Sequence, residues 1–423
     1  MALLVMKFGG SSVSDAEAMR RVAGRVVSSH QAGNQVAVVV SAMGDTTDEL
    51  LDLAAQVSPG VPPQREMDML LSAGERISMA LLAMAIEKLG VPAKSFTGAQ
   101  AGMRTDTAHG RARLLDVQPA RVRLALDEGR VAIVAGFQGI STDDDITTLG
   151  RGGSDTTAVA LAAALDADVC EIYTDVDGLY TADPRIVPSA RPVTRLTIEE
   201  TLEMAAHGAK ILHLRAVEYA RRFHVPLHVR SSFSDKEGTW ILVGRPLTED
   251  TMEEPIISGI AHDRSLGKVT AVGIPDRPGA AAAVVGAVSR AGVSVDMIVQ
   301  NVSTSDAATS DISFTIPETD GQTTVAAVRG LQAEMGFSDV LYTSHVGKLS
   351  LVGAGMRSNP SVAARLFSAL AEAGVNIEMI STSEIRISVI CDQADLEAGV
   401  RAVHTAFDLD AEAEAVVYGG TGR

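Results

Sequence analysis

The last third of this chain contains an internal repeat, and a repeat limits the folds that are open to it. Residues 267–298 read GKVTAVGIPDRPGAAAAVVGAVSRAGVSVDMI, and residues 347–380 read GKLSLVGAGMRSNPSVAARLFSALAEAGVNIEMI, with two residues added in the loop before Pro360. Each copy predicts a strand, a loop, a helix with an apolar stripe and a second strand. We therefore expect two small modules of the same structure.

Before the repeat the pattern is different. Up to about residue 230, short β-branched runs alternate with amphipathic segments, which is typical of a parallel sheet between helices. The predicted strands are Leu3–Phe8, Gln35–Val40, Arg130–Ala135, Asp168–Tyr173 and Pro226–Arg230. We expect the first helix to begin with a capping box of Ser14 and Glu17 and to end at Gly33, and the second to begin near Thr47.

The boundary between the two parts is expected within residues 231–255. There the alternation stops, and turn-forming and acidic residues collect. The predicted organisation is an N-terminal domain over residues 1–245 and a C-terminal region over residues 246–423, with its repeats at about 265–345 and 346–423.

Composition argues against several kinds of partner. The formal net charge of −17 disfavours a nucleic acid or an anionic membrane, because both are bound through excess Lys and Arg. The opening MALLVMKFGG fits neither a signal peptide nor an anchor, so a cytoplasmic protein is expected. Cys170 and Cys391 lie far apart and lack Cys or His partners at zinc spacing, so we expect neither a disulfide framework nor a zinc site, and no metal-ligating residue is assigned.

Two glycine-containing segments have the character of anion-binding loops. KFGGSS (7–12) follows the first strand, and its glycines allow backbone N–H groups to approach a phosphate. On its own this segment is better explained as a tight turn with a solvated lysine. TTLGRGGSDTTAVALAAAL (147–165) adds three glycines and Arg151 before a helix that starts near Ser154, which exceeds what a helix cap needs. The second segment predicts a site for a carboxylate or a phosphate.

Carboxylates mark two further segments. SAGERIS sets Glu75 inside an apolar helix, where a charged group needs a partner. A surface pair of Glu75 with Arg76 or Lys88 is the alternative. YTDVDGLYTADPR (173–185) follows a strand and is longer than a strand connection usually requires. Its carboxylates suit Mg²⁺ or a ribose, and equally turns closed by Asp side chains.

Together these segments resemble a known family. The family is aspartate kinase, of the amino-acid kinase fold, and the resemblance rests on KFGGSS, VSAMGDTTDELL, GERIS, TTLGRGGSDTTAVALAAALDAD, YTDVDGLYTADPR and HGAKILH, in this order. It covers nearly the whole chain, because the repeat resembles the paired ACT regulatory domains of that family. The spacing is most similar to the short, monofunctional enzymes of Gram-positive type. The resemblance implies an α/β fold, with a parallel-rich central sheet between helices, followed by two α+β ACT domains.

The resemblance also implies a reaction. ATP with Mg²⁺ would phosphorylate the side-chain carboxylate of L-aspartate to 4-phospho-L-aspartate, the first step of lysine, threonine and methionine biosynthesis. Lysine, threonine or both would inhibit the enzyme through the ACT domains. Because a carboxylate is already ionised at neutral pH, its attack on phosphorus needs no general base. Positioning and charge stabilisation would be the whole task of the protein.

The residues that the resemblance implies fall into four groups. The catalytic residues are Lys7 and Asp155, which organises the lysine. The L-aspartate site consists of Thr47, Glu75 at the ammonium, Arg151 at the α-carboxylate, and Ser154. The nucleotide site consists of Lys7, Phe8, Gly9, Gly10, Ser41, Thr174, Asp175, Tyr180, Asp183, Arg185 and Lys210. The effector site consists of Asp276, Gly279, Ala281, Ser294, Asp296 and Gln300 of the first module, facing Asn376, Ile377, Thr382, Ser383 and Glu384 of the second.

Assembly and two alternative functions complete the expectations. ACT modules expose sheet edges and pair, so a homo-oligomer is expected, and a separately translated C-terminal subunit starting near Met252 is an option. One alternative is another amino-acid kinase, acting on glutamate, N-acetylglutamate or a glutamyl substrate; Glu75 favours a free ammonium. The other is a non-catalytic amino-acid sensor, against which Lys7 and Asp155 count.

Overall fold

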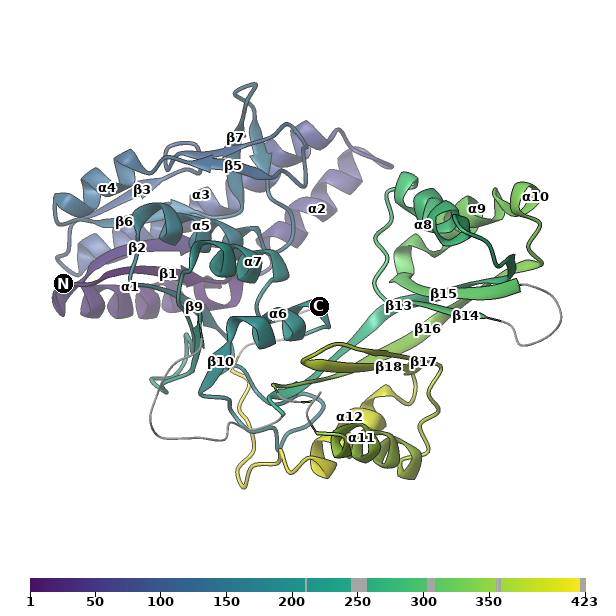
Figure 1. Cartoon of the computed structure of the whole chain (residues 1–423). Helices are drawn as coiled ribbons and strands as arrows, with labels where there is room; N and C mark the ends of the chain where they lie inside the picture. The colour runs from purple at the N-terminus through teal and green to yellow at the C-terminus, as the bar shows by residue number, and fades with distance from the viewer. Residues whose placement is uncertain (210, 245–256, 303–308, 355, 357–358, 419–423) are drawn as a thin grey trace.

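The computed structural model describes residues 1–423 except 210, 245–256, 303–308, 355, 357–358 and 419–423. Its strands form an eight-stranded sheet and a four-stranded sheet in the N-terminal part, and a six-stranded sheet in the C-terminal part. Figure 1 shows the N-terminal part, coloured purple to teal, beside the C-terminal part, coloured green to yellow. Two residues singled out from the sequence, Lys210 and Met252, lie outside the described residues.

The large sheet has the strand order β10-β12-β11-β9-β1-β2-β6-β3. Its strands are β1 (Leu3–Phe8), β2 (Gln35–Val40), β3 (Ala93–Phe96), β6 (Val131–Ala135), β9 (Val169–Thr174), β10 (Arg195–Thr197), β11 (Leu227–Ser231) and β12 (Thr239–Leu242). All neighbours are parallel except β11 and β12. The five predicted strands and their parallel arrangement are therefore confirmed, with boundaries shifted by at most one residue.

Helices cover both faces of this sheet. The helices of the N-terminal part are α1 (Ala16–Gln31), α2 (Thr46–Val57), α3 (Gln64–Lys88), α4 (Ala120–Asp127), α5 (Gly153–Leu165), α6 (Ile198–Ala206) and α7 (Leu214–Phe223), of which α2 packs on α3 and has no buried residue. Successive side chains of a strand point to opposite faces. Val5 of β1 accordingly packs in a core with α4, α5 and α7, whereas Met6 packs in a second core with α1 and α3. Strands apolar on both faces thus lie between two helical layers, which confirms the α/β prediction.

The start of α1 differs from the prediction by one residue. Asp15, and not Ser14, is the N-cap: its Oδ1 accepts hydrogen bonds from the N–H groups of Glu17 at 2.8 Å and Ala18 at 2.9 Å. A single carboxylate thus satisfies two donors that the helix leaves free, and the capping box of Ser14 and Glu17 is wrong. The helix ends at Gln31, just before Gly33, whose φ of +90° favours glycine.

A small sheet links α3 to α5. Its order is β5-β4-β7-β8, and its strands are β4 (Met103–Thr105), β5 (Leu114–Val117), β7 (Gln138–Ser141) and β8 (Ile146–Thr148). β8 lies against α3 and leads into the glycine-rich stretch that precedes α5. The sheet therefore fixes where the chain enters α5.

The C-terminal part is built on one sheet of order β14-β15-β13-β16-β18-β17. Its elements are β13 (Gly259–Pro275), α8 (Ala280–Arg290), β14 (Ile298–Val302), β15 (Thr309–Pro317), η2 (Glu318–Asp320), α9 (Gly321–Arg329), α10 (Gln332–Met335), β16 (Asp339–Val352), α11 (Ser361–Glu372), β17 (Met379–Thr382), β18 (Arg386–Asp392) and α12 (Leu396–Ala406). Each copy of the repeat forms a strand, a helix and a strand, as predicted.

The long strands β13 and β16 take part in both modules. Residues 268–272 of β13 pair with residues 339–343 of β16 in the first module, whereas residues 259–263 pair with residues 348–352 in the second. Register shifts separate the two stretches. Ile260 accordingly packs in the core of the second module. The modules thus share their central strands, and the chain enters the second module before it builds the first.

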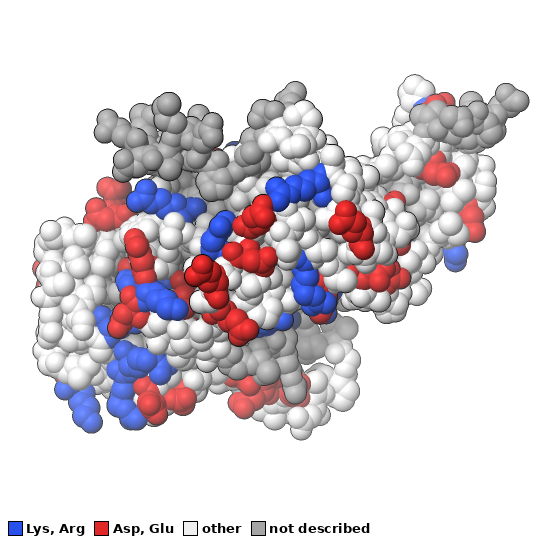
Figure 2. All heavy atoms as spheres, turned by 90° about the horizontal axis from the view of Figure 1, so that it is seen from below, with Lys and Arg blue, Asp and Glu red and all other residues white. Residues whose placement is uncertain are grey.

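Helix α3 has the length and apolar composition of a membrane-spanning helix. Within the described residues it is the one helix long and apolar enough to span a membrane by length and composition, with a mean hydropathy of 1.5. In the structure one face of α3 packs under the large sheet, where Leu82 and Ile86 are fully buried, whereas Ile77 and Met84 are exposed. On the face shown in Figure 2, basic and acidic side chains are interspersed.

Candidate active site

The parallel register brings the chemistry-bearing loops to one edge of the large sheet. Phe8, the last residue of β1, lies opposite Val40 of β2 and Tyr173 of β9. Because parallel strands end at the same edge, KFGGSS, SAMGD and YTDVDG all leave the sheet there. Phe8 itself is buried and stacks on Tyr173 with ring centroids 4.6 Å apart. Its side chain belongs to the core under the large sheet.

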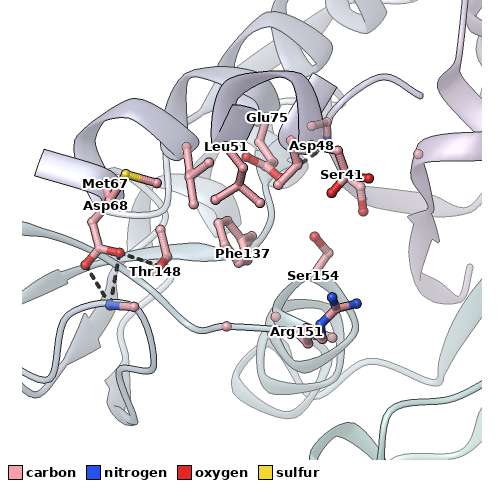
Figure 3. Close-up of a pocket in the computed structure, with 18 of the residues that line it drawn as sticks. Ser41, Asp48, Leu51, Met67, Asp68, Glu75, Phe137, Thr148, Arg151 and Ser154 are labelled. Atoms are coloured by element: carbon pink, nitrogen blue, oxygen red, sulfur yellow. Dashed lines mark hydrogen bonds between the residues drawn. The ribbon is translucent and has the colours of Figure 1, made fainter. Parts of the chain in front are cut away.

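A cavity of about 640 Å³ lies at this edge. Residues predicted from the sequence line it, namely Lys7, Gly9, Gly10, Ser41, Thr47, Glu75, Arg151, Ser154 and Asp155. In Figure 3, Glu75 and Ser41 lie on one side of the cavity, and Arg151 and Ser154 lie on the other. Tertiary structure thus collects residues from β1, β2, α2, α3 and α5 around one space of a size typical for a small ligand.

Lys7 and Asp155 form an ion pair inside this cavity. The Nζ atom of Lys7, at the end of β1, lies 2.6 Å from Oδ1 of Asp155, in the first turn of α5. About a tenth of each side chain is exposed, 13% and 11%. The carboxylate also lies where the α5 dipole favours negative charge. The pair therefore fixes a positive charge beside the glycines of KFGGSS.

Glu75 is buried in the wall opposite α5. It is 3% exposed, so the predicted alternative, a surface pair with Arg76 or Lys88, is wrong. Its Oε1 accepts a hydrogen bond from the Ala42 N–H at 3.2 Å, whereas its Oε2 is buried without a hydrogen-bond partner among the described residues. Burial raises the pKa of Glu75 to about 7. A buried carboxylate oxygen without a partner is suited to a ligand ammonium.

Gly74 explains how α3 brings Glu75 so close to the loop after β2. A Cβ atom on Gly74 would lie 2.7 Å from the Cβ of Ala42, which is closer than packed atoms approach. The missing side chain lets the helix and the loop touch, and the Ala42 N–H then reaches the Glu75 carboxylate. Gly74 and Glu75 therefore act together: the glycine allows the close approach, and the glutamate makes the hydrogen bond.

The glycines before α5 are required by close packing. Gly152 has a φ of +68°, and a Cβ atom there would lie 2.0 Å from Cγ of His213. A Cβ atom on Gly153 would lie 2.9 Å from the ring of Phe137. The chain can therefore turn sharply and present Arg151 at the exposed rim of the cavity, with Ser154 inside. The stretch is more than a helix cap, in agreement with the sequence.

The second group of predicted nucleotide residues lines a separate cavity of about 300 Å³. Thr174, Asp175, Tyr180, Asp183 and Arg185 belong to this group. The Asp183 side chain accepts a hydrogen bond from the Arg185 N–H at 2.9 Å, which is a turn closed by an Asp side chain. Arg185 also lies 3.5 Å from the Asp175 carboxylate. The turn interpretation of this segment is confirmed at Asp183, and the assignment of its carboxylates to Mg²⁺ or a ribose stays a prediction.

Several residues that line the first cavity had not been singled out from the sequence, and Asp68 and Phe137 are two of them. Asp68 of α3 is fully buried and accepts hydrogen bonds from the Gly110 N–H at 3.0 Å and the Thr148 hydroxyl (Figure 3). These hydrogen bonds hold α3 to the segments that contain Gly110 and Thr148, which also line the cavity. A carboxylate within the apolar run MDMLL was the available signal. Phe137, with a φ of +68°, had no signal beyond the preceding glycine.

Two of the predicted effector residues lie on the edge strands of the C-terminal sheet, and the others lie in α8 or in loops. Gln300 is on β14 and Thr382 is on β17, the outermost strands on opposite sides. Gln300 and Thr382 therefore lie on different edges within one chain, whereas the segments that begin at Met297 and Met379 approach each other, because the two methionines pack in one cluster. The predicted residues of the first module are Asp276, Gly279, Ala281, Ser294, Asp296 and Gln300, and those of the second are Asn376, Ile377, Thr382, Ser383 and Glu384.

Two of the matched acids have partners in the other module. Asp296 lies 2.5 Å from Nζ of the buried Lys348, and Glu378 pairs with Lys268. Lys268 and Lys348 occupy matching positions of the repeat, so the two ion pairs are related by the same internal symmetry. The recurrence of an acid at both places thus has a structural explanation in the joining of the modules.

Comparisons with known proteins agree with this architecture. Residues 2–231 match the amino acid kinase family, and residues 269–330 and 349–407 match the ACT domain. The aspartokinases of Mycolicibacterium smegmatis and Corynebacterium glutamicum are 62% and 59% identical over 424 residues, covering 100% of both chains in each comparison. This chain belongs to the aspartokinases of the amino acid kinase family, and it is accordingly a phosphotransferase.

Two solved structures of one relative are similar over nearly the whole chain. E. coli aspartokinase III in complex with aspartate and ADP, in its R-state, has a TM-score of 0.81 at 28% identity and covers 96% of this chain and 99% of its own. The same enzyme in complex with lysine and aspartate, in its T-state, has a TM-score of 0.71 over the same shares. The arrangement described here is therefore more similar to the R-state.

Proposed function

We propose that this chain transfers the γ-phosphoryl group of ATP to the side-chain carboxylate of L-aspartate and forms 4-phospho-L-aspartate in the cytoplasm. This reaction is the first step of lysine, threonine and methionine biosynthesis. The observation that carries the proposal is the cavity shared by the unpartnered Glu75 oxygen, Arg151 and the Lys7–Asp155 pair. The ligands of the E. coli relative, aspartate and ADP, are of the same chemical kinds.

The amino acid is held at its two α-substituents. Its ammonium binds Glu75 Oε2, which relieves the unfavourable burial of an unpaired carboxylate. Its α-carboxylate binds the planar guanidinium of Arg151, which can donate two parallel hydrogen bonds. Thr47 and Ser154 add hydroxyl groups from two sides of the cavity. The remaining carboxylate of the substrate is then left for the end of the cavity that contains Lys7.

The transferred group is stabilised by charge. Lys7, with the N–H groups of Gly9 and Gly10, neutralises the phosphate oxygens, and Asp155 holds the lysine in place. A Cβ atom on Gly10 would lie 3.0 Å from the carbonyl oxygens of Ala42 and Gly44, so this loop is compact before any ligand arrives. A preorganised donor array favours the transition state, because it needs no rearrangement.

Mg²⁺ enters this proposal as part of the nucleotide. The described residues contain no group of three or more His, Cys, Asp or Glu side chains that could hold a metal ion. Mg²⁺ typically binds one or two carboxylates together with phosphates and water. Asp155, at the phosphate end, is a carboxylate of that kind, so the donor set fits. When bound, the ion supplies neutralisation of phosphate charge.

We also propose that lysine, threonine or both inhibit the enzyme through the ACT modules. The lysine complex of the E. coli T-state supports this. Because Gln300 of β14 and Thr382 of β17 lie on opposite edge strands, two copies that pair through these strands would bring Gln300 of one near Thr382 of another. A homo-oligomer would thus complete the effector site, and a subunit translated from Met252 would contain both edges.

The decisive experiment is a substrate panel. The purified chain is incubated with ATP and Mg²⁺ and with L-aspartate, L-glutamate or N-acetyl-L-glutamate, and hydroxylamine traps any acyl phosphate as a hydroxamate. We expect product with L-aspartate alone. Product with a glutamate derivative instead would indicate another amino-acid kinase. No product with any substrate would indicate a non-catalytic sensor.

A further inference from the structure

The C-terminal end of the regulatory region returns to the N-terminal domain. After α12, the segment 410–418 runs along the loop that follows β9. Its backbone N–H groups donate from Ala411 to the Ser189 carbonyl at 2.7 Å, from Ala415 to the Pro188 carbonyl at 2.8 Å and from Tyr418 to the Asp175 carbonyl at 2.8 Å. Isolated bridges also join Val176 to Val417 and Ala190 to Asp410. The loop is thus bonded along much of its length.

A buried row of hydrogen-bonded side chains anchors the same loop. Thr181 Oγ1 lies 2.8 Å from Nε2 of His404, and His404 Nδ1 lies 3.0 Å from Oδ1 of Asp410. Thr181 and His404 are 2% and 0% exposed, so water does not compete for these bonds. The Thr181 carbonyl also accepts a hydrogen bond from Ile260 of β13 at 2.7 Å. The loop after β9 is therefore held from the regulatory side by α12, by β13 and by the C-terminal segment.

The C-terminal segment also forms a wall of the 300 Å³ cavity. The N-terminal domain contributes residues 174–185 and the end of α6, and β13 contributes residues 260–262. Val417 completes the lining from the C-terminal segment. Its neighbour Val416 is 43% exposed and does not line the cavity. The cavity is therefore built by both parts of the chain.

We propose that the C-terminal segment 410–418 positions the nucleotide-binding loop 174–185, so that the regulatory region completes the nucleotide site. This inference rests on the proposed function and on the assignment of Thr174, Asp175 and Arg185 to the nucleotide, which the family resemblance implies. Ordering a loop of this length is entropically unfavourable, and binding is weakened when the ligand must order it. The hydrogen bonds from the C-terminal segment order it in advance. Val417 is a positioning residue, and its loss should weaken nucleotide binding more than it slows chemistry at Lys7.

The test compares two adjacent valines. V417D places a charge in the cavity wall, whereas V416D makes the same change on the exposed neighbour. We expect V417D to raise KM for ATP by about 5-fold or more, because an added carboxylate in a wall that already contains Asp175 and Asp183 repels the phosphates of a nucleotide. KM for aspartate should stay within about 2-fold. V416D should match the wild type in kcat and in both KM values. V417I, which keeps an apolar side chain, should keep the low KM for ATP.

A second variant and a binding measurement keep the test decisive. If V417D lowers the melting temperature, a chain that ends at Ala415 and the milder V417A replace it. Calorimetric titration with ADP measures nucleotide binding without turnover, so failure of the kinase reaction and failure of this inference are distinguishable. Unchanged KM for ATP and unchanged ADP affinity in V417D and in the shortened chain would overturn the inference. Equal changes in V416D and V417D would overturn it as well.

Discussion

Lys7 Nζ lies 2.6 Å from Asp155 Oδ1, although the two residues are far apart in the sequence. The pair joins the C-terminal end of β1 to the first turn of α5. Because both side chains are largely buried, the lysine is held in one place, and solvent screens its charge weakly. The pair is the fixed point around which the proposed phosphate site is arranged.

Lys7→Ala removes the positive charge of the proposed transition state. We expect kcat to fall by a factor of about 10² to 10³, as for other lost transition-state donors. Lys88→Ala, at an exposed lysine of α3, is the matched control. Since Asp155 loses its partner, the melting temperature is measured alongside. An unchanged kcat in Lys7→Ala would remove Lys7 from the catalytic site.

Glu75→Gln tests the proposed ammonium site through pH. Burial raises the pKa of Glu75 to about 7, so the carboxyl is neutral below that pH and cannot pair with an ammonium. In the wild type, KM for aspartate should therefore rise as the pH falls through about 7. In Glu75→Gln, KM for aspartate should be high, by about 10-fold, and no longer follow this titration. The same pH profile in both chains would argue against Glu75.

Glu75→Gln should weaken aspartate binding but stabilise the fold. A raised pKa means that the folded chain binds this proton more tightly than the unfolded chain, so ionisation of Glu75 destabilises the fold. The destabilisation appears as the pH rises from the ordinary pKa of the group through about 7. Without ligand, Glu75→Gln should melt higher than the wild type at about pH 8, and the difference should shrink at about pH 5. Thermal melts at both pH values decide this.

Arg151→Lys keeps the charge and removes the planar fork. We expect KM for aspartate to rise by about 10-fold or more, while KM for ATP changes far less, because the guanidinium is assigned to the α-carboxylate. Arg20→Lys, an exposed residue of α1, serves as the control. Initial rates at varied aspartate and varied ATP separate the two constants. A matching rise in both would assign Arg151 to the nucleotide.

Gln300→Ala and Asn376→Ala test the effector site. Each should weaken inhibition by at least about 5-fold, the low end of typical coupling, and leave kcat nearly unchanged. Inhibition curves with lysine, with threonine and with both are recorded for wild type and variants. Because Gln300 lies on an edge strand of the sheet, sedimentation of each variant shows whether the assembly is retained. Full sensitivity in both variants would show that the effector pocket is elsewhere.

Much of the local structure followed from the sequence. The strands of the large sheet are β-branched runs that are apolar on both faces, and this pattern marked them to within one residue. The glycine-rich stretch before α5 was recognisable because few residues tolerate a φ such as that of Gly152. The N-cap of α1 was missed by one position, since Ser14 and Asp15 are both capable caps and only the path of the chain selects Asp15.

The tertiary structure decided how these pieces meet. The sequence showed that Glu75 needs a partner, but whether it faces solvent or a cavity depends on the rotation of α3 against the sheet. Likewise, the repeat predicted two modules, yet only the strand order placed β14 and β17 on opposite edges and let β13 serve both modules. Hydrophobic periodicity and turn-forming residues depend on neighbours in the chain, so they can be recognised from the sequence alone. Strand order, burial and the Lys7–Asp155 pair depend on contacts between distant segments, and these are fixed when the whole chain packs.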